Sequence, residues 1–444
     1  MGSQDQPLNV LLLRDTYAWS PGTVLRHIRA LSTDSRHYVH SLGHIGDLPA
    51  GLEIDRFDAI VLHYSIFIFD RAYLSDAARD RIRAFRGVKV VFIQDEHRHI
   101  NRVVDALVEL GVDILFTCVP EQEAAKVYSP SRLPELRKVT VLTGYLDEAL
   151  AERPVPSWRE RTIDVGYRAR KLPPWLGSLG REKWLIGDRF AREAQELQLT
   201  SDISMREEDR LYGDAWIEFV AGCKAVLGSE SGASVFDFTG EIAETVERHV
   251  LREPSVTFDE LRALYFCDED GAVDSAVISP RCFEAASLRT LMILYEGSYS
   301  GVLEAGRHFV ALKKDHSNIG EVVEILRSPE EAARIINNAF EEVAKNPAYS
   351  HAALTEIFDT VLAEQASERR PASQPYDVSE LNRIDRGHRR RLRIRKMRTY
   401  LRYAVSRLVF GNLLAVLGET RRDQATNALR RLYRRAVVAL QGES

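Results

Sequence analysis

Apolar runs of strand length alternate with amphipathic runs of helix length over the first part of the chain. The strand-like runs lie at 8–13, 57–64, 88–95, 113–119 and 138–144. The residues between them show helical spacing over 23–31, 76–85, 100–111 and 121–128. Apolar strands separated by helices favour a parallel sheet that is covered on both faces. We therefore predict a doubly wound α/β domain over residues 1–152, whose ligands bind beyond the carboxyl ends of the strands.

A second alternating pattern follows the proline-rich stretch at 152–158, which ends the first domain. Its strand-like runs lie at 162–169, 223–232 and 306–315, its helical runs at 182–197 and 330–346, and an apolar helix continues into a strand over 281–297. This pattern predicts a second Rossmann-like domain over 153–365. A polar stretch with two prolines predicts a linker at 366–382, followed by a tail at 383–444. The expected fold is α/β, with two doubly wound domains facing a cleft.

The composition is that of a soluble globular protein, but its charge is unevenly distributed. The chain has 444 residues, of which 45% are hydrophobic and 28% charged, and this excludes a disordered chain, a collagen-like chain or a disulfide scaffold. The formal net charge is −5. Between Arg383 and Ala436, however, there are 17 Arg or Lys residues and three acidic residues. An acidic body therefore carries a basic tail.

The cysteines and the hydrophobic runs restrict the location. The four cysteines show no C-x-x-C spacing, so we expect neither a zinc site nor a disulfide framework, and a reducing, cytoplasmic compartment fits best. The N-terminus lacks the basic region of a signal peptide. No window reaches the ~18 apolar residues of a membrane-spanning helix.

Cations follow the first strand of the second domain. Arg168, Arg170 and Lys171 come directly after Gly166, and a helix begins after two prolines. Arginine offers a planar fork of donors and a helix N-terminus adds partial positive charge, so this loop suits a diphosphate. A solvated basic loop is the alternative, because the spacing is not that of a P-loop.

Two further segments of the second domain place a carboxylate near the same edge. GSESGAS, at 228–234, contains Glu230 and Ser231 in a Gly/Ser loop, and it is not a nucleophile elbow because its central residue is glutamate. SPRCFEAASLRT places Arg281 and Glu284 in the first turn of an apolar helix. A carboxylate there either caps the helix or accepts hydrogen bonds from a ribose diol. We include Ser231, Arg281 and Glu284 in the predicted nucleotide-binding set.

In the first domain, QDEHRH follows a strong strand at its carboxyl end. Asp95, Glu96, His97 and His99 are therefore expected near the cleft, where a carboxylate or imidazole acts as a base or contacts the transferred group. Their alternative role is that of an ordinary polar loop, and His63 and Asp15 are lesser candidates. A metal site at His97 and His99 lacks a compelling third ligand.

These segments together resemble bacterial GT-B glycosyltransferases of surface-polysaccharide clusters. The resemblance spans roughly residues 8–362 and rests on IDVGYRARKLPPWLGSLGREKWLIGDRF, CKAVLGSESGASVFDFTGEI and the segment that begins ISPRCFEAASLRT. In the retaining members an E-x7-E motif binds the donor, and its second glutamate matches Glu284. Its first would fall on Ala276, so Glu230 is assigned that role across an insertion of about 50 residues. The resemblance further implies that Arg168, Arg170 and Lys171 bind the diphosphate.

The predicted function is therefore transfer of a sugar, expected to be a hexose, from a nucleotide-sugar to a glycan, lipid-linked or protein acceptor, without a metal or other cofactor. The predicted catalytic residues are Asp95, His97 and Glu230. Asp268-Glu269-Asp270 matches the D-x-D metal motif of GT-A enzymes, but it precedes Gly271 in an expected turn and the two-domain pattern argues against it. The alternatives are a non-catalytic nucleotide- or glycan-binding scaffold and a sugar-nucleotide epimerase.

The tail has apolar residues at helical spacing among arginines, as in Ile394, Met397, Leu401 and Val405. Such a helix suits an anionic bilayer, and we expect a peripheral position on the cytoplasmic face of the inner membrane. A helix packed on the acidic body or on a second subunit is the main alternative, and nucleic-acid binding is disfavoured.

Overall fold

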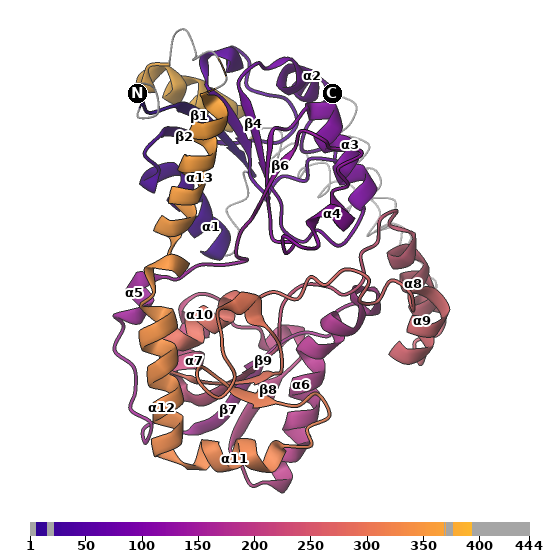
Figure 1. Cartoon of the computed structure of the whole chain (residues 1–444), viewed down its shortest axis with the longest axis vertical. Coiled ribbons are helices and arrows are strands. Elements are labelled where there is room, and N and C mark those ends of the chain that lie inside the picture. Colours follow the sequence, from indigo (N-terminus) through magenta and orange to yellow (C-terminus); the bar gives the residue numbers. More distant parts are fainter. Residues whose placement is uncertain (1–5, 16–21, 368, 370–375, 393–444) are drawn as a thin grey trace, which may run out of the picture.

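The computed structural model describes residues 6–15, 22–367, 369 and 376–392, which form two domains, one above the other in Figure 1. Each domain is built on one parallel sheet, with strand order β2-β1-β3-β4-β5-β6 in the first and β11-β10-β9-β7-β8 in the second. The predicted fold class is confirmed.

The first sheet has six strands, and its four inner strands are largely buried because helices cover both faces. The strands are β1 (Asn9–Arg14), β2 (Tyr38–Gly43), β3 (Ala59–Leu62), β4 (Val88–Phe92), β5 (Ile114–Thr117) and β6 (Arg137–Thr140). The helices are α1 (Gly22–Arg29), α2 (Asp76–Ala84), α3 (Ile100–Leu110), α4 (Ala124–Val127) and α5 (Glu148–Ala151). Every residue of β3 and β5 is buried, which explains their continuous apolar sequences. The polar edge strand β2 was not predicted.

The second domain repeats this construction with five strands. They are β7 (Ile163–Arg168), β8 (Ser201–Ser204), β9 (Cys223–Gly228), β10 (Leu291–Tyr295) and β11 (Val310–Leu312). The helices are α6 (Gly177–Glu196), α7 (Asp214–Gly222), α8 (Glu241–Arg252), α9 (Phe258–Tyr265), α10 (Pro280–Ser287), α11 (Ile319–Arg327) and α12 (Pro329–Ala339). The edge strand β8 and the helices α7, α8, α9 and α11 were not predicted.

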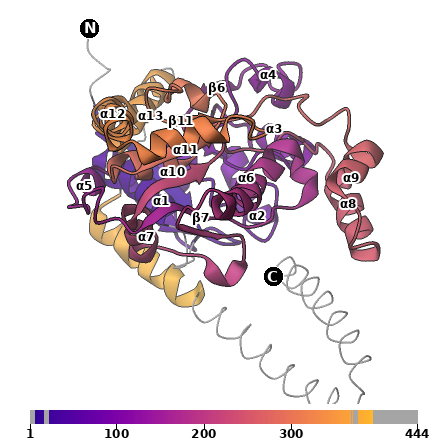
Figure 2. The same cartoon turned by 90° about the horizontal axis from the view of Figure 1, so that it is seen from below.

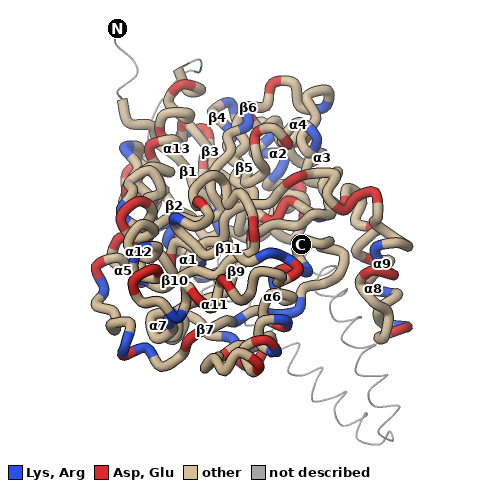
Figure 3. The backbone as a smooth tube through the Cα atoms, turned by 60° about the horizontal axis from the view of Figure 1, so that its bottom comes forward, with Lys and Arg blue, Asp and Glu red and all other residues tan. Residues whose placement is uncertain are grey.

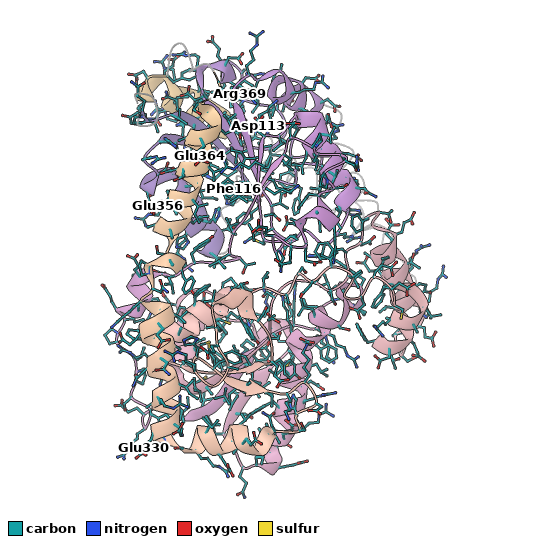
Figure 4. The ribbon with its side chains drawn as sticks, in the orientation of Figure 1. Asp113, Phe116, Glu330, Glu356, Glu364 and Arg369 are labelled. Carbon is teal, nitrogen blue, oxygen red and sulfur yellow. The ribbon has the colours of Figure 1, made fainter. Side chains whose placement is uncertain are left out.

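The helix α13 (His351–Ala366) leaves the second domain and returns to the first. Leu354 and Phe358 pack in the same apolar cluster as Val10 and Phe92 of the first sheet. Figure 4 shows Glu364 beside the first domain, where its carboxylate forms an ion pair with Arg137 at 2.7 Å. The structure therefore differs from the predicted boundary at 365, because residues 351–366 pack with the first domain.

A further helix over 378–392 also packs on the first domain. Leu381 is buried in that domain's core, Glu380 pairs with Arg56 at 3.2 Å, and the ring of His388 stacks on that of His44. The structure thus differs from the predicted linker at 366–382 and shows the start of the tail docked on the body. The rest of the tail lies outside the described residues. Within the described part of the chain, no helix is long and apolar enough to span a membrane.

A long insertion between β9 and α10 joins the two domains a second time. Phe236 and Val273, from its two ends, belong to the core cluster of the first domain. The N–H of Asp237 donates to the carbonyl of His97 at 2.9 Å, and the N–H of Asn101 donates to the carbonyl of Phe238 at 3.0 Å. The helices α8 and α9 form a hairpin in the middle of this insertion and stand apart from the body (Figure 2).

Candidate functional site

Two adjoining cavities lie between the domains. The first, of about 970 Å³, is lined mainly by the second domain, and the other, of about 720 Å³, is lined mainly by the first domain. Arg170, Lys183 and Ser231 line both cavities, so the two are continuous at these residues. The carboxyl ends of β4, β7 and β9 reach this junction through the residues that follow them, as expected for doubly wound domains.

Three cations from separate elements of the second domain meet around this junction. Arg170 follows β7, Lys183 lies in the second turn of α6, and Arg281 lies in the first turn of α10. None of the three forms an ion pair with a described carboxylate. Burial is the main cause that lowers the pKa of Lys183, and the charges of Arg281 and Arg170 lower it further, whereas Asp95 raises it. Lys183 was not singled out from the sequence.

Arg168 lies in the same cavity but its donors are already used. It forms an ion pair with Asp202 of β8 at 2.8 Å and donates to the carbonyls of Asp202 and Asp209. Its guanidinium also lies over the ring of Phe219, 4.3 Å from the centroid. The side chain of Arg168 therefore holds the edge strand against β7.

Two other residues predicted in this loop do not line either cavity. Gly166 is buried, and a Cβ there would lie 2.3 Å from the Sγ of Cys223, so its role is close packing. Lys171 is exposed, with its Nζ 5.0 Å from the centre of the Trp184 ring. Only Arg170 of the predicted loop cations thus faces the cleft with an uncommitted charge.

Glu284 lies in α10 and lines the first cavity, but it is in the second turn of the helix and not in the first turn that the sequence predicts. Its Oε2 accepts a hydrogen bond from the indole N–H of Trp216 at 2.7 Å. Burial raises the pKa of Glu284, while that hydrogen bond and the charge of Arg281 lower it. Arg281 lies over the same indole, 4.6 Å from its centre, and donates to the carbonyl of Arg168 at 2.5 Å. Trp216, which the sequence did not point to, organises this end of the site.

The two predicted residues of the Gly/Ser loop after β9 lie in different places. Ser231 lines both cavities, and its backbone pairs with that of Val277 at 2.7 and 3.0 Å. Glu230 lines neither cavity. Its Oε1 accepts from the N–H of Tyr299 at 2.7 Å and from the hydroxyl of Ser298 at 3.2 Å. This carboxylate therefore orders the loop after β10, away from Asp95 and His97.

Asp95 and His97 line the second cavity. Asp95 is exposed and has a φ of 58°, a left-handed conformation that is uncommon for a side-chain-bearing residue and turns the chain sharply after β4. Burial is the main cause that lowers the pKa of His97, Asp95 raises it, and Lys183 and Arg98 lower it. Asp95 and Lys183 therefore interact across the cleft.

Glu96, between them, points into the protein and fixes this loop. Its carboxylate accepts from the hydroxyls of Thr117 and Tyr128 and from the N–H of Cys118 at 3.1 Å. No described cation forms an ion pair with it. Burial raises the pKa of Glu96 to about 7, against the lowering effect of these hydrogen bonds.

The remaining sequence candidates have structural partners. His63 is buried and its Nε2 lies 3.1 Å from Nδ1 of His27. His99 precedes α3 and packs near Phe69. Asp270, from the D-x-D match, accepts from the N–H and hydroxyl of Ser178 and from Arg262. Among the described residues, no group of three or more His, Cys, Asp or Glu side chains is arranged to hold a metal ion.

Two doubly wound domains with a cleft at the carboxyl ends of both sheets, and a last helix that returns to the first domain, constitute the GT-B fold. No protein-family model matches the chain, and no curated protein matches it either.

Three of the solved structures with a similar fold each have low sequence identity to this chain. HepE from Anabaena in complex with UDP-glucose is 11% identical, with 81% of this chain and 100% of that chain covered and a TM-score of 0.44. Sucrose-phosphate synthase from Thermosynechococcus elongatus is 12% identical, covering 82% and 100%, with a TM-score of 0.44. TarM is 10% identical, covering 68% of this chain and 54% of that chain, with a TM-score of 0.39. We therefore base the functional proposal on the residues of the cleft.

Proposed function

We propose that the protein is a glycosyltransferase that moves a sugar from a nucleotide-sugar to an acceptor hydroxyl. The observation that carries this proposal is the convergence of Arg170, Lys183 and Arg281 around the first cavity, two of them at its junction with the second, with no ion pair to any described carboxylate. Three cations held together in a partly buried cleft repel one another, and a bound anion relieves that repulsion. A diphosphate fits because its oxygens accept from several donors at once.

The surrounding residues suit the other parts of such a donor. Glu284 can accept from the hydroxyls of a ribose beside Trp216, and both line the first cavity. The diphosphate would then lie at the junction, with the sugar directed to the second cavity. During transfer the cations stabilise the leaving diphosphate, and this is the basis for proposing that no metal is required.

The second cavity would hold the acceptor. Asp95, from the first domain, faces Lys183, and either Asp95 or His97 could take the proton of the attacking hydroxyl. We propose a hexose as the transferred sugar and a glycan, lipid-linked or protein acceptor, in the assembly of a surface polysaccharide or glycoconjugate. The basic tail supports an acceptor at an anionic membrane surface.

The test is nucleotide binding by matched variants. Thermal shifts of the full chain are measured with nucleoside diphosphates that differ in base, because a ligand that binds the folded state raises its stability. Arg170→Ala, Lys183→Ala and Arg281→Ala should each weaken binding by about 10–100-fold. Arg192→Ala is the control, since Arg192 is an exposed residue of α6 that pairs with Asp188. Equal affinity in all four variants would refute the assigned site.

The position of Glu230 favours one other function. Because its carboxylate is committed to the loop at Ser298 and Tyr299, the first glutamate of the E-x7-E pattern has no counterpart in the cleft. A scaffold that binds a nucleotide without turnover fits this observation. Release of free nucleoside diphosphate in the presence of an acceptor distinguishes the enzyme from the scaffold, and conversion of the donor without acceptor would indicate an epimerase.

A further inference from the structure

The hairpin of α8 and α9 presents an outer face that nothing in the described structure covers. Its inner face packs on the second domain, where Val246 and Leu261 contact the cluster that contains Trp175. Leu251 of α8 is 71% exposed and Leu264 of α9 is 61% exposed. Each leucine adds exposed apolar surface to the hairpin.

The same hairpin is strongly acidic. Residues 241–270 include nine acidic and three basic side chains, and Figure 3 shows acidic positions on both helices. Four exposed acids, Glu241, Glu244, Asp268 and Glu269, form no ion pair with any described residue. The hairpin therefore carries both unpaired negative charge and exposed leucines, and a basic, amphipathic partner would complement both features.

The chain itself contains a segment of this kind, at 393–444. It has twelve Arg or Lys residues against three acidic residues, and Met397, Leu401, Val405 and Leu408 recur at helical spacing. It follows the helix over 378–392, which is docked on the first domain. Its 52 residues span about 78 Å as a helix and more than that if extended, which exceeds the ~30 Å diameter of a small domain.

We propose that residues 393–444 bind the outer face of the α8–α9 hairpin of the same chain. The leucines of the hairpin contact the apolar side of the segment, and its arginines pair with the four unpaired acids. The insertion that carries the hairpin also contributes Phe236 and Val273 to the core of the first domain. The bound segment would therefore contact the insertion that connects the two domains.

The test uses a cysteine that the hairpin already provides. Cys267 is exposed, Cys223 and Cys282 are buried, and Cys118 is partly buried, so a maleimide–benzophenone reagent labels Cys267 preferentially. Illumination of the labelled full chain should give crosslinks from Cys267 to peptides within 393–444, and Cys267→Ser should abolish them. Crosslinks confined to other peptides would overturn the proposal, and crosslinks lost on strong dilution would place the segment on a second copy and overturn its assignment to the same chain.

Hydrogen exchange gives an independent measurement. Amides of α8 and α9 in the full chain should exchange at least about fivefold faster in the triple variant Glu241→Lys, Glu244→Lys, Glu269→Lys than in the unmodified protein. The control is Glu324→Lys, Glu330→Lys, Glu356→Lys, which makes the same charge change at exposed sites away from the hairpin. The protection should also weaken at about 1 M salt, where the Debye length is ~3 Å.

Vesicles test the competing partner. If the segment binds vesicles of an anionic phospholipid while exchange in the hairpin is the same with and without them, the segment and the hairpin are not in contact and the proposal fails. If vesicle binding deprotects the hairpin, the two compete for one segment, as the proposal requires.

Discussion

Ionisable groups on the two sides of the cleft are satisfied in different ways. In the first domain, the carboxylate of Glu96 is buried without a cation and is satisfied by Thr117, Tyr128 and a backbone N–H. In the second domain, Arg170 and Lys183 form no ion pair with a described carboxylate, and both line the cavities, where Asp95 of the first domain raises the pKa of Lys183.

This difference separates architecture from binding. An ionisable group that is enclosed by hydrogen bonds from its own domain holds the chain in place, because those partners fix its position. A charge left free at the cleft is available to a ligand. By the same criterion Arg168 belongs with Glu96, although its position in the sequence is only two residues from Arg170.

The largest expected effect is on the rate of sugar transfer, and it concerns Asp95 in the loop after β4. Asp95→Asn should lower the rate of sugar transfer by about 10²–10⁴-fold, because the amide cannot accept the proton of an acceptor hydroxyl. Nucleoside diphosphate affinity should be unchanged. Asp105→Asn, an exposed change on α3, is the control. A full rate in the Asp95 variant would remove this residue from the reaction.

The next effect concerns stability and pH at Glu96. Since burial raises its pKa from 4.5 to about 7, the folded protein holds the proton more tightly than the unfolded chain does. Its contribution to stability is therefore complete below about pH 4.5 and declines through about pH 7, by up to about 3 kcal/mol.

Glu96→Gln removes this titration. The stability of the variant relative to the unmodified protein should rise between about pH 5 and about pH 8, measured by urea unfolding at both values. A stability difference that does not change with pH would mean that Glu96 is not held protonated by the fold.

Arg168 and Arg170 should respond in opposite ways to the same substitution. Arg168→Gln should lower the free energy of unfolding by about 2 kcal/mol, because Asp202 loses a charged hydrogen-bond partner. Arg170→Gln should change it by less than about 0.5 kcal/mol, as at other exposed positions. Denaturant titration of the pair measures this, and equal losses would contradict the distinction between the two arginines.

The smallest effect is expected at Glu284. Glu284→Gln should weaken nucleoside diphosphate binding by about fivefold, the value of one hydrogen bond, since an amide presents a single acceptor oxygen to the ribose. Binding of inorganic pyrophosphate, which has no ribose, should not change. Calorimetry with both ligands makes the comparison, and a loss with pyrophosphate would place Glu284 at the phosphates instead.

The sequence was sufficient to predict every strand that is buried on both sides. The two strands it missed, β2 and β8, lie at the edges of their sheets and carry polar residues such as His40 and Asp202. Edge strands bury little, so their residues need not be apolar, and hydropathy does not reveal them. The helices α8 and α9 were missed for a related reason, because they form an exposed hairpin with a narrow apolar side.

The same omission limited the prediction of the site. The partner of Arg168 is Asp202, on the unpredicted strand β8, so the sequence offered no reason to treat Arg168 differently from Arg170. Lys183 was missed because its orientation depends on where α6 begins, at Gly177, earlier than the helical pattern indicated. The position of Asp95 followed directly from the end of a strongly patterned strand, whereas Glu284 lies one turn further into its helix than predicted.

Phe236 and Val273 restrict how the two domains of such a protein can be recombined with those of another chain. A hybrid that joins the first half of one chain to the second half of another must match these two side chains to the foreign core they enter. Helix α13 imposes the same condition from the other end of the chain. Replacing the second domain to change the donor would therefore require that the segments around Phe236 and Val273 and helix α13 be retained with the first domain. Recombination at the proline-rich connection alone would yield a poorly packed protein.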